Sequence, residues 1–317
     1  MARDRPKGVM GLGWAAFESA ASGRFEHVPT ATRYDPSVVR RVTFQAGGSH
    51  RWILSALTTP RTRPAPWKIV VITGAPSWAE YWAPVLAHLP HDREMVVVDR
   101  PGFASSQPES HVGDIRVQAE ALMPALSTVP GQRLLLVGQS YGAAISTLMA
   151  ACRPRRLEGL VLLSGYLGEP GPMARSLVRL GQRVLKVIPR DLRNAVLEVG
   201  QQAPQLTHMH RALPRISADV HIVHGDQDDF APISAAERLA REARTLRPIR
   251  FRSVAGANHF LNDGPPARVI AELEACMPGP ALPHVTLGRR IQRTLHDTRH
   301  ALIDLNEARR ATFGPSR

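Results

Sequence analysis

The sequence is poor in cysteine and lysine and lacks long hydrophobic runs. The shortage of cysteine and that of apolar runs each exclude a class of protein. The 317 residues include two cysteines, Cys152 and Cys276, whose spacing suggests neither a disulfide framework nor a metal site. No apolar run approaches the roughly 18 residues that a membrane-spanning helix needs. The apolar stretch at 9–17 is short and contains glycines, so a signal peptide is not expected. We therefore expect a cytoplasmic protein.

Positive charge comes almost wholly from arginine. The formal net charge is +13, and Lys7, Lys68 and Lys186 are the only lysines. Such a surface either attracts an acidic partner or is a solvated basic face. The cluster Arg153-Pro-Arg-Arg156 has no interleaved aromatic residues and no nucleic-acid motif, so nucleic-acid binding is not expected. His208-Met-His210 has no nearby acidic or cysteine ligand, so no metal site is predicted.

Short apolar segments alternate with helical ones along most of the chain. The apolar segments are nearly continuous, as in parallel strands covered on both faces, and the helical segments fit as crossover connections. Two strands at 42–45 and 52–57 are predicted to open the sheet as an antiparallel pair. Six more strands are predicted at 69–72, 95–98, 134–137, 160–163, 220–223 and 249–254, with helices at 79–89, 117–126, 143–152, 234–245 and 267–276. The pattern predicts an α/β fold in one elaborated domain.

The most informative motif is Gly138-Gln-Ser-Tyr-Gly142, which joins a buried-looking strand to an alanine-rich helix. A serine on such a turn exposes its hydroxyl, and the chain can fold that tightly only if the positions two before and two after it lack bulky side chains. Both positions are glycine. The helix that follows also directs its unpaired amides toward negative charge on a substrate oxygen. The motif predicts Ser140 as a nucleophile.

Two later motifs supply an acid and a base, each directly after a predicted strand. Residues 224–232 read His-Gly-Asp-Gln-Asp-Asp-Phe-Ala-Pro, and residues 256–260 read Gly-Ala-Asn-His-Phe. Open α/β sheets place their ligands at such strand ends. Ser140 is a poor nucleophile until His259 accepts its proton, and a carboxylate on the far imidazole nitrogen fixes the tautomer. Asp226, Asp228 and Asp229 are the candidate carboxylates.

These motifs, with Asp99-Arg-Pro-Gly-Phe103 after the fourth predicted strand, give a chain that resembles the α/β-hydrolase superfamily over roughly residues 40–278. The resemblance implies an α/β-hydrolase fold, a mostly parallel eight-stranded sheet with helices on both faces and a helical cap insertion. It selects Asp228 as the acid, in the order Ser140, Asp228, His259. It implies an oxyanion hole formed by the backbone N–H groups of Tyr141 and Ala75. Thr73 stands where the family usually has histidine, which puts the hydrogen bonding of that loop in question.

The resemblance divides the chain into four parts. They are an N-terminal extension at 1–39, the hydrolase core at 40–164 and 218–278, a helical cap at 165–217, and a C-terminal segment at 279–317. In the cap, apolar residues recur at helical spacing opposite a basic side. Those apolar residues are Met173, Leu177, Leu180, Val184 and Ile188. The cap is either a lid packed over the pocket or a lid that meets anionic lipid or an anionic substrate.

The C-terminal segment is predicted to form a basic amphipathic helix. Its leucines and Ile291 recur at intervals compatible with one helical face, and arginine outnumbers acidic residues. Residues 284–317 therefore pack against the domain, join a second subunit, or adsorb weakly to an anionic membrane surface. The last alternative would make the protein peripheral at a membrane.

The predicted function is that of a cofactor-independent serine hydrolase acting on a small-molecule carboxylic ester. Its acyl-enzyme mechanism needs neither a metal nor an organic cofactor. The aromatic residues Trp78, Phe103 and Phe260 flank the site loops and are predicted to bind an apolar acyl group. Thioesters, lactones, amides and carbon–carbon bonds are open to the same triad. The alternative is a ligand-binding or signalling protein on the hydrolase scaffold, with slow or no turnover.

Overall fold

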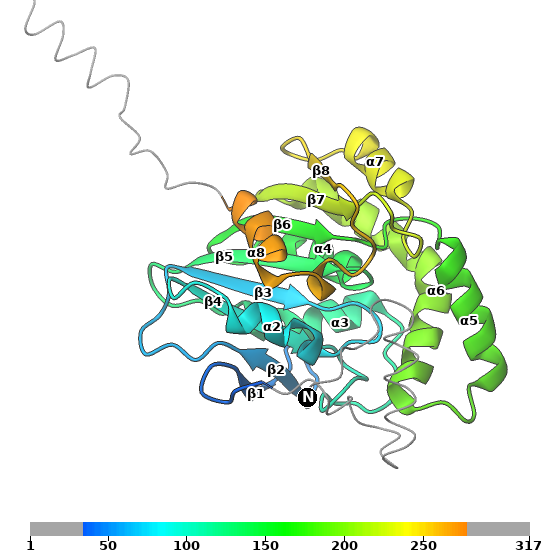
Figure 1. The fold of residues 1–317 in the computed structure, drawn as a ribbon, viewed down its shortest axis with the longest axis horizontal. Helices are drawn as coiled ribbons and strands as arrows, with labels where there is room; N and C mark the ends of the chain where they lie inside the picture. Colours follow the sequence, from blue (N-terminus) through cyan, green and yellow to red (C-terminus); the bar gives the residue numbers. More distant parts are fainter. Residues whose placement is uncertain (1–33, 278–317) are drawn as a thin grey trace, which may run out of the picture. The chain divides into compact units, whose positions relative to one another are not determined.

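The computed structural model describes residues 34–277, and within them eight strands form one sheet (Figure 1). The strand order is β1-β2-β4-β3-β5-β6-β7-β8. The strands are β1 (Arg40–Gln45), β2 (Ile53–Thr58), β3 (Trp67–Ile72), β4 (Arg93–Asp99), β5 (Arg133–Gln139), β6 (Leu157–Leu163), β7 (Asp219–Gly225) and β8 (Arg250–Val254). β2 pairs antiparallel with β1 and β4, and the remaining pairs are parallel. The predicted C-terminal helix and most of the predicted N-terminal extension lie outside the described residues.

Helices cover both faces of the sheet. They are α2 (Ala83–Ala87), α3 (Ile115–Leu122), α4 (Gly142–Ala151), α5 (Pro172–Val184), α6 (Arg190–Ala212), α7 (Ile233–Glu242) and α8 (Pro266–Ala275), with short 3-10 turns η1 (Ala79–Trp82), η2 (Met123–Leu126), η3 (Leu213–Arg215) and η4 (Leu261–Asp263). α3, α4, α7 and the end of α6 pack on one face, while α2 and α8 pack on the other. The predicted fold class is confirmed.

No helix within residues 34–277 is long and apolar enough to cross a membrane. The helix predicted at 117–126 is observed as α3 followed by η2. Pro124 explains the change, because it has no N–H to donate to the carbonyl of Glu120. That carbonyl instead accepts the N–H of Met123, three residues on, which is a 3-10 bond.

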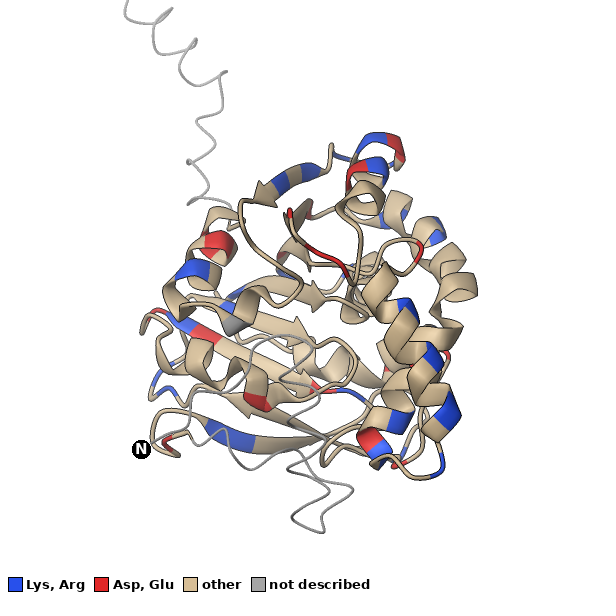
Figure 2. Ribbon diagram, turned by 45° about the vertical axis from the view of Figure 1, so that its right-hand side comes forward, with Lys and Arg blue, Asp and Glu red and all other residues tan. Residues whose placement is uncertain are grey.

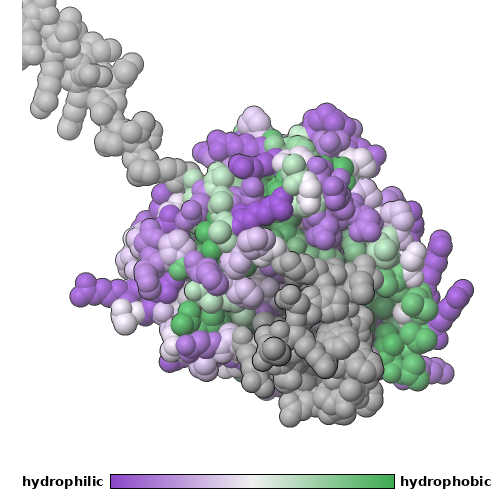
Figure 3. Space-filling view, viewed as in Figure 1, coloured by the Kyte–Doolittle hydropathy of each residue, from purple (hydrophilic) through white to green (hydrophobic). Residues whose placement is uncertain are grey.

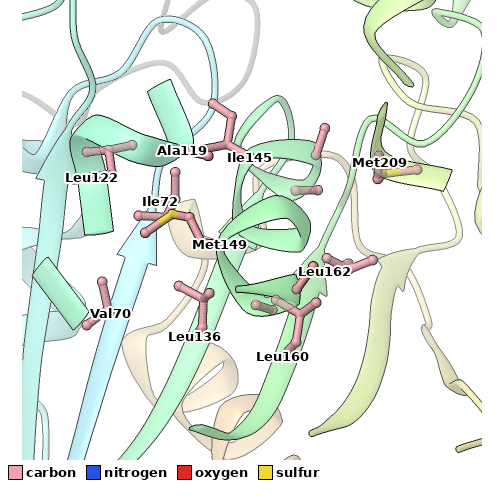
Figure 4. Close-up of a cluster of buried hydrophobic side chains, with 14 of the residues drawn as sticks. Val70, Ile72, Ala119, Leu122, Leu136, Ile145, Met149, Leu160, Leu162 and Met209 are labelled. Atoms are coloured by element: carbon pink, nitrogen blue, oxygen red, sulfur yellow. The ribbon is translucent and has the colours of Figure 1, made fainter. Parts of the chain in front are cut away.

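The larger core lies between the central strands and helices α3 and α4 (Figure 4). The strands β3, β5 and β6 contribute valine, isoleucine and leucine side chains, and the helices contribute alanine, leucine, isoleucine and methionine. The labelled residues are Val70, Ile72, Leu136, Leu160 and Leu162 from the strands, and Ala119, Leu122, Ile145, Met149 and Met209 from the helices. All of them are buried. The nearly continuous apolar runs of the sequence thus correspond to strands that are covered on both faces.

Helices α5 and α6 form a hairpin, here called the cap hairpin, at the carboxyl ends of the central strands (Figure 1). It lies within the predicted cap at 165–217, whose role as a lid stays a prediction. The C-terminal half of α6 joins the core through Leu206 and Met209. Figure 2 marks several Lys and Arg positions in blue along the ribbon of the hairpin, and Arg175, Arg179 and Arg183 of α5 are exposed.

The apolar residues predicted to share one side of the cap are covered only in part. Leu180 is 58% exposed, and the other four residues of the predicted stripe are half-buried. The buried residues of α5 are small, Ala174 and Gly181. An atom at the Cβ position of Gly181 would lie 2.4 Å from a methyl carbon of Val196, so α5 and α6 approach too closely for a large side chain between them. Large apolar residues are left at the surface, and Figure 3 shows a hydrophobic patch over the α5–α6 turn, where Val187 is 74% exposed.

Gly181→Leu should therefore destabilise the protein, because the new side chain has to separate α5 from α6. We expect a loss of about 1–3 kcal/mol in the free energy of unfolding, the usual range for overpacking. The neighbouring substitution Leu180→Ala should change it by about 0.5 kcal/mol or less, since Leu180 is exposed. Urea unfolding of the two variants measures both values. Equal effects would contradict the observed packing face.

Candidate active site

Ser140 occupies the turn between β5 and α4 in an unfavourable backbone conformation. Its φ is 50°, in the left-handed region that residues with a side chain rarely adopt. The turn is held by its neighbours, because the N–H of Ser140 donates to the carbonyl of Leu163 at 3.0 Å. The carbonyl of Ser140 accepts the N–H of Tyr166 at 3.1 Å. The surrounding structure thus imposes the conformation.

The glycines on either side of Ser140 are required by close approach of other atoms. An added Cβ on Gly138 would lie 2.0 Å from Oγ of Ser146, and one on Gly142 would lie 2.2 Å from the carbonyl oxygen of Ile72. Real Cβ atoms do not approach so closely. Helix α4 can therefore begin directly against the ends of β3 and β5, as the Gly-x-Ser-x-Gly pattern predicts.

Ser140, His259 and Asp228 meet at the carboxyl ends of β5, β8 and β7. Nε2 of His259 lies 2.9 Å from Oγ of Ser140. Nδ1 of His259 lies 2.8 Å from Oδ2 of Asp228. His259 and Asp228 are buried, at 5% and 8% exposure. This arrangement can pass the serine proton to the imidazole while the carboxylate holds the other ring nitrogen.

Asp228 is fixed by donors on both of its oxygens. Oδ1 accepts the N–H of Phe230 at 3.0 Å and that of Ala231 at 2.8 Å. Burial alone raises the pKa of Asp228, but hydrogen bonds from His224 and His259 and from the Ala231 amide outweigh it and lower the pKa below its ordinary value. Asp228 is therefore a carboxylate at neutral pH.

The two neighbouring carboxylates occupy different positions. Asp226 and Asp229 are exposed. Oδ1 of Asp226 accepts the N–H of Gly256 at 2.8 Å and so stabilises the turn that precedes His259. Of the three carboxylates it is Asp228 that contacts the imidazole of His259, the one that the resemblance implies.

His224 is a second histidine on the same carboxylate. It is fully buried, and its Nε2 lies 2.7 Å from the carbonyl oxygen of Ala231 and 3.2 Å from Oδ2 of Asp228. A carbonyl oxygen only accepts, so Nε2 carries the proton and points it between the two oxygens. His224 therefore supports Asp228 as a hydrogen-bond donor, a role that no spacing rule indicates.

Two phenylalanines surround the imidazole of His259. The ring of Phe230 stacks on it at 5.1 Å between centroids, and that of Phe260 meets it edge-on at 5.2 Å. Both side chains are half-buried. Phe260 was predicted to bind substrate, whereas Phe230 was missed, although it follows Asp228 by two residues within the acid motif.

Trp78 and Phe103 are buried. Trp78 is 3% exposed, and its Nε1 donates to Oδ2 of Asp191 in α6 at 2.6 Å. Phe103 is fully buried, with its ring 4.8 Å from the guanidinium of Arg100. Both side chains are thus held by contacts within the protein, and their contact with substrate stays a prediction.

The loop Thr73-Gly-Ala-Pro76 follows β3 and lies beside Ser140. An added Cβ on Gly74 would lie 3.0 Å from Cβ of Ser140 and 3.5 Å from its Oγ. The Thr73 hydroxyl donates to the carbonyl of Val98 at 3.0 Å and bonds to the hydroxyl of Ser77. Thr73 thus supplies the loop with hydrogen bonds in the absence of a histidine. Ala75 and Tyr141 stay the predicted oxyanion donors.

Within residues 34–277 no group of three or more His, Cys, Asp or Glu side chains could hold a metal ion. His208 and His210 lie on α6.

The sequence and the fold are similar to those of known hydrolases. The family model described as alpha/beta hydrolase fold matches residues 68–201. A thermophilic esterase from Thermogutta terrifontis superposes with a TM-score of 0.58 at 18% identity, over 74% of this chain and 97% of that one, a likeness that shows the fold. The chain therefore has the α/β-hydrolase fold, and its residues 68–201 are similar to the family of that name.

Several known proteins are similar in sequence to parts of this chain. A 2-hydroxy-6-oxononadienedioate/2-hydroxy-6-oxononatrienedioate hydrolase from Paraburkholderia phymatum is 25% identical over 204 residues, which cover 52% of this chain and 71% of that protein. Protein PHYLLO, chloroplastic, from Arabidopsis thaliana is 29% identical over 106 residues, which cover 31% of this chain and 6% of that protein. The chain spans less than half the length of several other relatives it matches.

The contacts of Asp228 predict how Ser140 will react with a fluorophosphonate probe. Asp228→Asn should slow covalent labelling by orders of magnitude, up to about 10⁴-fold, because the amide cannot hold the imidazole in the required tautomer. Asp226→Asn and Asp229→Asn are the matched controls and should retain most of the rate. Mass spectrometry of the labelled peptide measures it. A slow Asp226→Asn variant beside a fast Asp228→Asn variant would reassign the acid.

The same probe measures how the rate of labelling at Ser140 depends on pH. Labelling should rise with pH in a single step, because His259 accepts the serine proton only after losing its own. The lowered pKa of Asp228 keeps that carboxylate ionised at every pH above about 4, the ordinary value for aspartate, so it adds no second step. A rate independent of pH, or two steps above pH 4, would contradict this arrangement.

Proposed function

We propose that the chain is a cofactor-independent serine hydrolase that cleaves a carboxylic ester of a small molecule with an apolar acyl group. The observation that supports this most is the hydrogen-bonded line from Ser140 through His259 to Asp228, with distances of 2.9 and 2.8 Å. The left-handed Ser140 at a strand-to-helix turn adds to it, since the turn presents the hydroxyl in front of the start of α4.

In this reaction His259 transfers one proton while the acyl-enzyme forms and one while water hydrolyses it. As Oγ of Ser140 bonds to the ester carbonyl carbon, Nε2 of His259 takes the hydroxyl proton, and Asp228 stabilises the imidazolium. The N–H groups of Ala75 and Tyr141 hold the oxyanion. His259 then gives the proton to the alcohol oxygen as its bond to carbon breaks. Water attacks the acyl carbon, His259 takes the water proton and returns it to Ser140, and the acid leaves.

The surroundings of His259 support an apolar acyl group. Phe230 and Phe260 lie against the imidazole and are both half-buried, so an acyl chain beside Ser140 would meet aromatic carbon. A serine nucleophile also favours acyl transfer, since its product is an ordinary ester that water can hydrolyse.

A second candidate is hydrolysis of a carbon–carbon bond. The relative from Paraburkholderia phymatum is named for such a substrate, a dienedioate, and this chain matches most of its length. A dianionic substrate would need cations near Ser140. The buried cation closest to the loop there, Arg100, is paired with Glu198. We therefore place the ester first.

The decisive experiment is turnover of p-nitrophenyl esters with acyl chains of two to twelve carbons by the full chain. Ser140→Ala should abolish turnover and fluorophosphonate labelling without lowering Tm, because the hydroxyl supplies chemistry and not packing. Ser146→Ala is the matched control, a buried serine six residues along whose hydroxyl donates only to the carbonyl of Ala143 at 3.0 Å. It should keep its activity.

Different failures lead to different conclusions. Substantial turnover by a folded Ser140→Ala variant would overturn the proposal. Labelling of Ser140 without hydrolysis of any ester would favour the carbon–carbon candidate, tested with a dienedioate. A natural protein that neither labels nor turns over would favour a binding role.

A further inference from the structure

Arg100, directly after β4, is a fully buried cation that the proposed mechanism does not use. A charge without water is costly unless it is paired and hydrogen-bonded, so the partners of Arg100 indicate its role. Two of them are backbone carbonyls of the loop beside Ser140. Nε donates to the carbonyl of Thr73 at 2.9 Å, and Nη2 donates to the carbonyl of Gly74 at 2.8 Å.

The bond to Gly74 fixes the direction of a predicted oxyanion donor. The carbonyl of Gly74 and the N–H of Ala75 belong to one planar trans peptide, in which they point in opposite directions. Holding the carbonyl toward Arg100 therefore holds the N–H of Ala75 away from Arg100. A cationic donor on the carbonyl also polarises the amide and makes its N–H a stronger donor.

The second predicted oxyanion donor also touches Arg100. The guanidinium carbon lies 4.7 Å from the ring centre of Tyr141 and 4.8 Å from that of Phe103, so the cation sits between two aromatic faces. Tyr141 is 1% exposed. One side chain thus contacts the peptide group that carries the N–H of Ala75, through the Gly74 carbonyl, and the ring of Tyr141.

The remaining partner of Arg100 comes from the cap hairpin. Nη1 and Nη2 donate to the two carboxylate oxygens of Glu198 in α6 at 2.9 and 2.8 Å, a bidentate pair with both side chains fully buried. Gln118 of α3 bonds to both partners, accepting from Arg100 and donating to Glu198, each at 2.7 Å. The guanidinium is therefore locked in place by a carboxylate 98 residues away along the chain.

We propose that Arg100 is a positioning residue that sets the oxyanion hole, and that Glu198 makes this setting depend on the cap helix α6. The inference rests on the proposed function, because it concerns the oxyanion of that reaction. Its consequence is that a change in α6 alters the rate of bond cleavage while leaving substrate binding and the Ser140–His259–Asp228 contacts intact.

The test uses Arg100→Lys and Glu198→Gln in the full chain, with the best ester substrate. Lysine keeps the charge but cannot hold two carbonyls and a bidentate carboxylate together. We expect kcat to fall about 10²–10³-fold, the usual effect of losing one oxyanion donor, with KM changed little. Glu198→Gln keeps one acceptor oxygen and should lower kcat about 10-fold, on the scale of one weakened charged hydrogen bond.

A second measurement separates positioning from general destabilisation. A trifluoromethyl ketone, which adds to Ser140 as a tetrahedral adduct, should lose affinity by the same factor as kcat in each variant. The pH dependence of turnover should be unchanged, since His259 and Asp228 are untouched. Arg41→Lys is the matched control, because Arg41 of β1 pairs with Asp99 and Glu80, whereas Arg100 holds the loop beside Ser140. It should lower Tm without lowering kcat of the folded protein.

The proposal is overturned if Arg100→Lys, or Glu198→Gln where the lysine variant does not fold, cleaves the ester at the natural rate. It is also overturned if kcat falls while the affinity for the ketone is unchanged, or if Arg41→Lys gives the same loss. Failure of the proposed function is distinguishable, since the natural protein would then show no ester turnover and no labelling of Ser140.

Discussion

The close approach of β3, β5 and α4 around Ser140 is the constraint on which the rest of the site depends. With glycine on both sides, the start of α4 comes within contact of the end of β3, and Ser140 is held at a φ of 50°. The same contact brings the loop after β3 beside the hydroxyl. The same contact between β3, β5 and α4 thus positions the nucleophile and the candidate oxyanion donors. The imidazole of His259 lies on a loop after β8.

Several buried charged side chains lie near the carboxyl ends of the strands, and neighbouring groups hold each of them. Asp228 and Arg100 are satisfied by several hydrogen bonds each. Asp99 differs, because burial and the nearby Glu80 raise its pKa, to about 7, against the opposing effect of Arg41. A raised carboxyl pKa means that the folded state binds the proton more tightly than the unfolded chain, so this group's contribution to stability falls as pH rises from about 4 to about 7. The lowered pKa of Asp228 acts in the opposite sense, stabilising above about pH 4.

Local patterns in the sequence were enough to predict the sheet and the position of Ser140. Apolar runs predicted the strands, because burial on both faces of the sheet leaves little room for polar residues. The spacing of Gly138 and Gly142 predicted the turn at Ser140, because the steric requirement there is local. Asp228 needed the family resemblance, since three carboxylates stand together. His224 and the Arg100–Glu198 pair could not be predicted, because their roles come from contacts between segments that only the fold brings together. The burial of Trp78 and Phe103 could not be predicted for the same reason, because interior and pocket aromatics look alike in a sequence.

The cap hairpin is attached to the chemical site at two places. Glu198 joins α6 to the loop beside Ser140 through Arg100, and the N–H of Gly171, just before α5, donates to the carbonyl of Phe230 in the acid loop at 2.7 Å. An added Cβ on Gly171 would lie 2.0 Å from the carbonyl oxygen of Asp229, so that junction accepts glycine alone. The cap is consequently not an exchangeable module. A hairpin transplanted from another protein of this fold would have to bring both a glycine at 171 and a carboxylate at 198, and this restricts which hairpins can replace the present one.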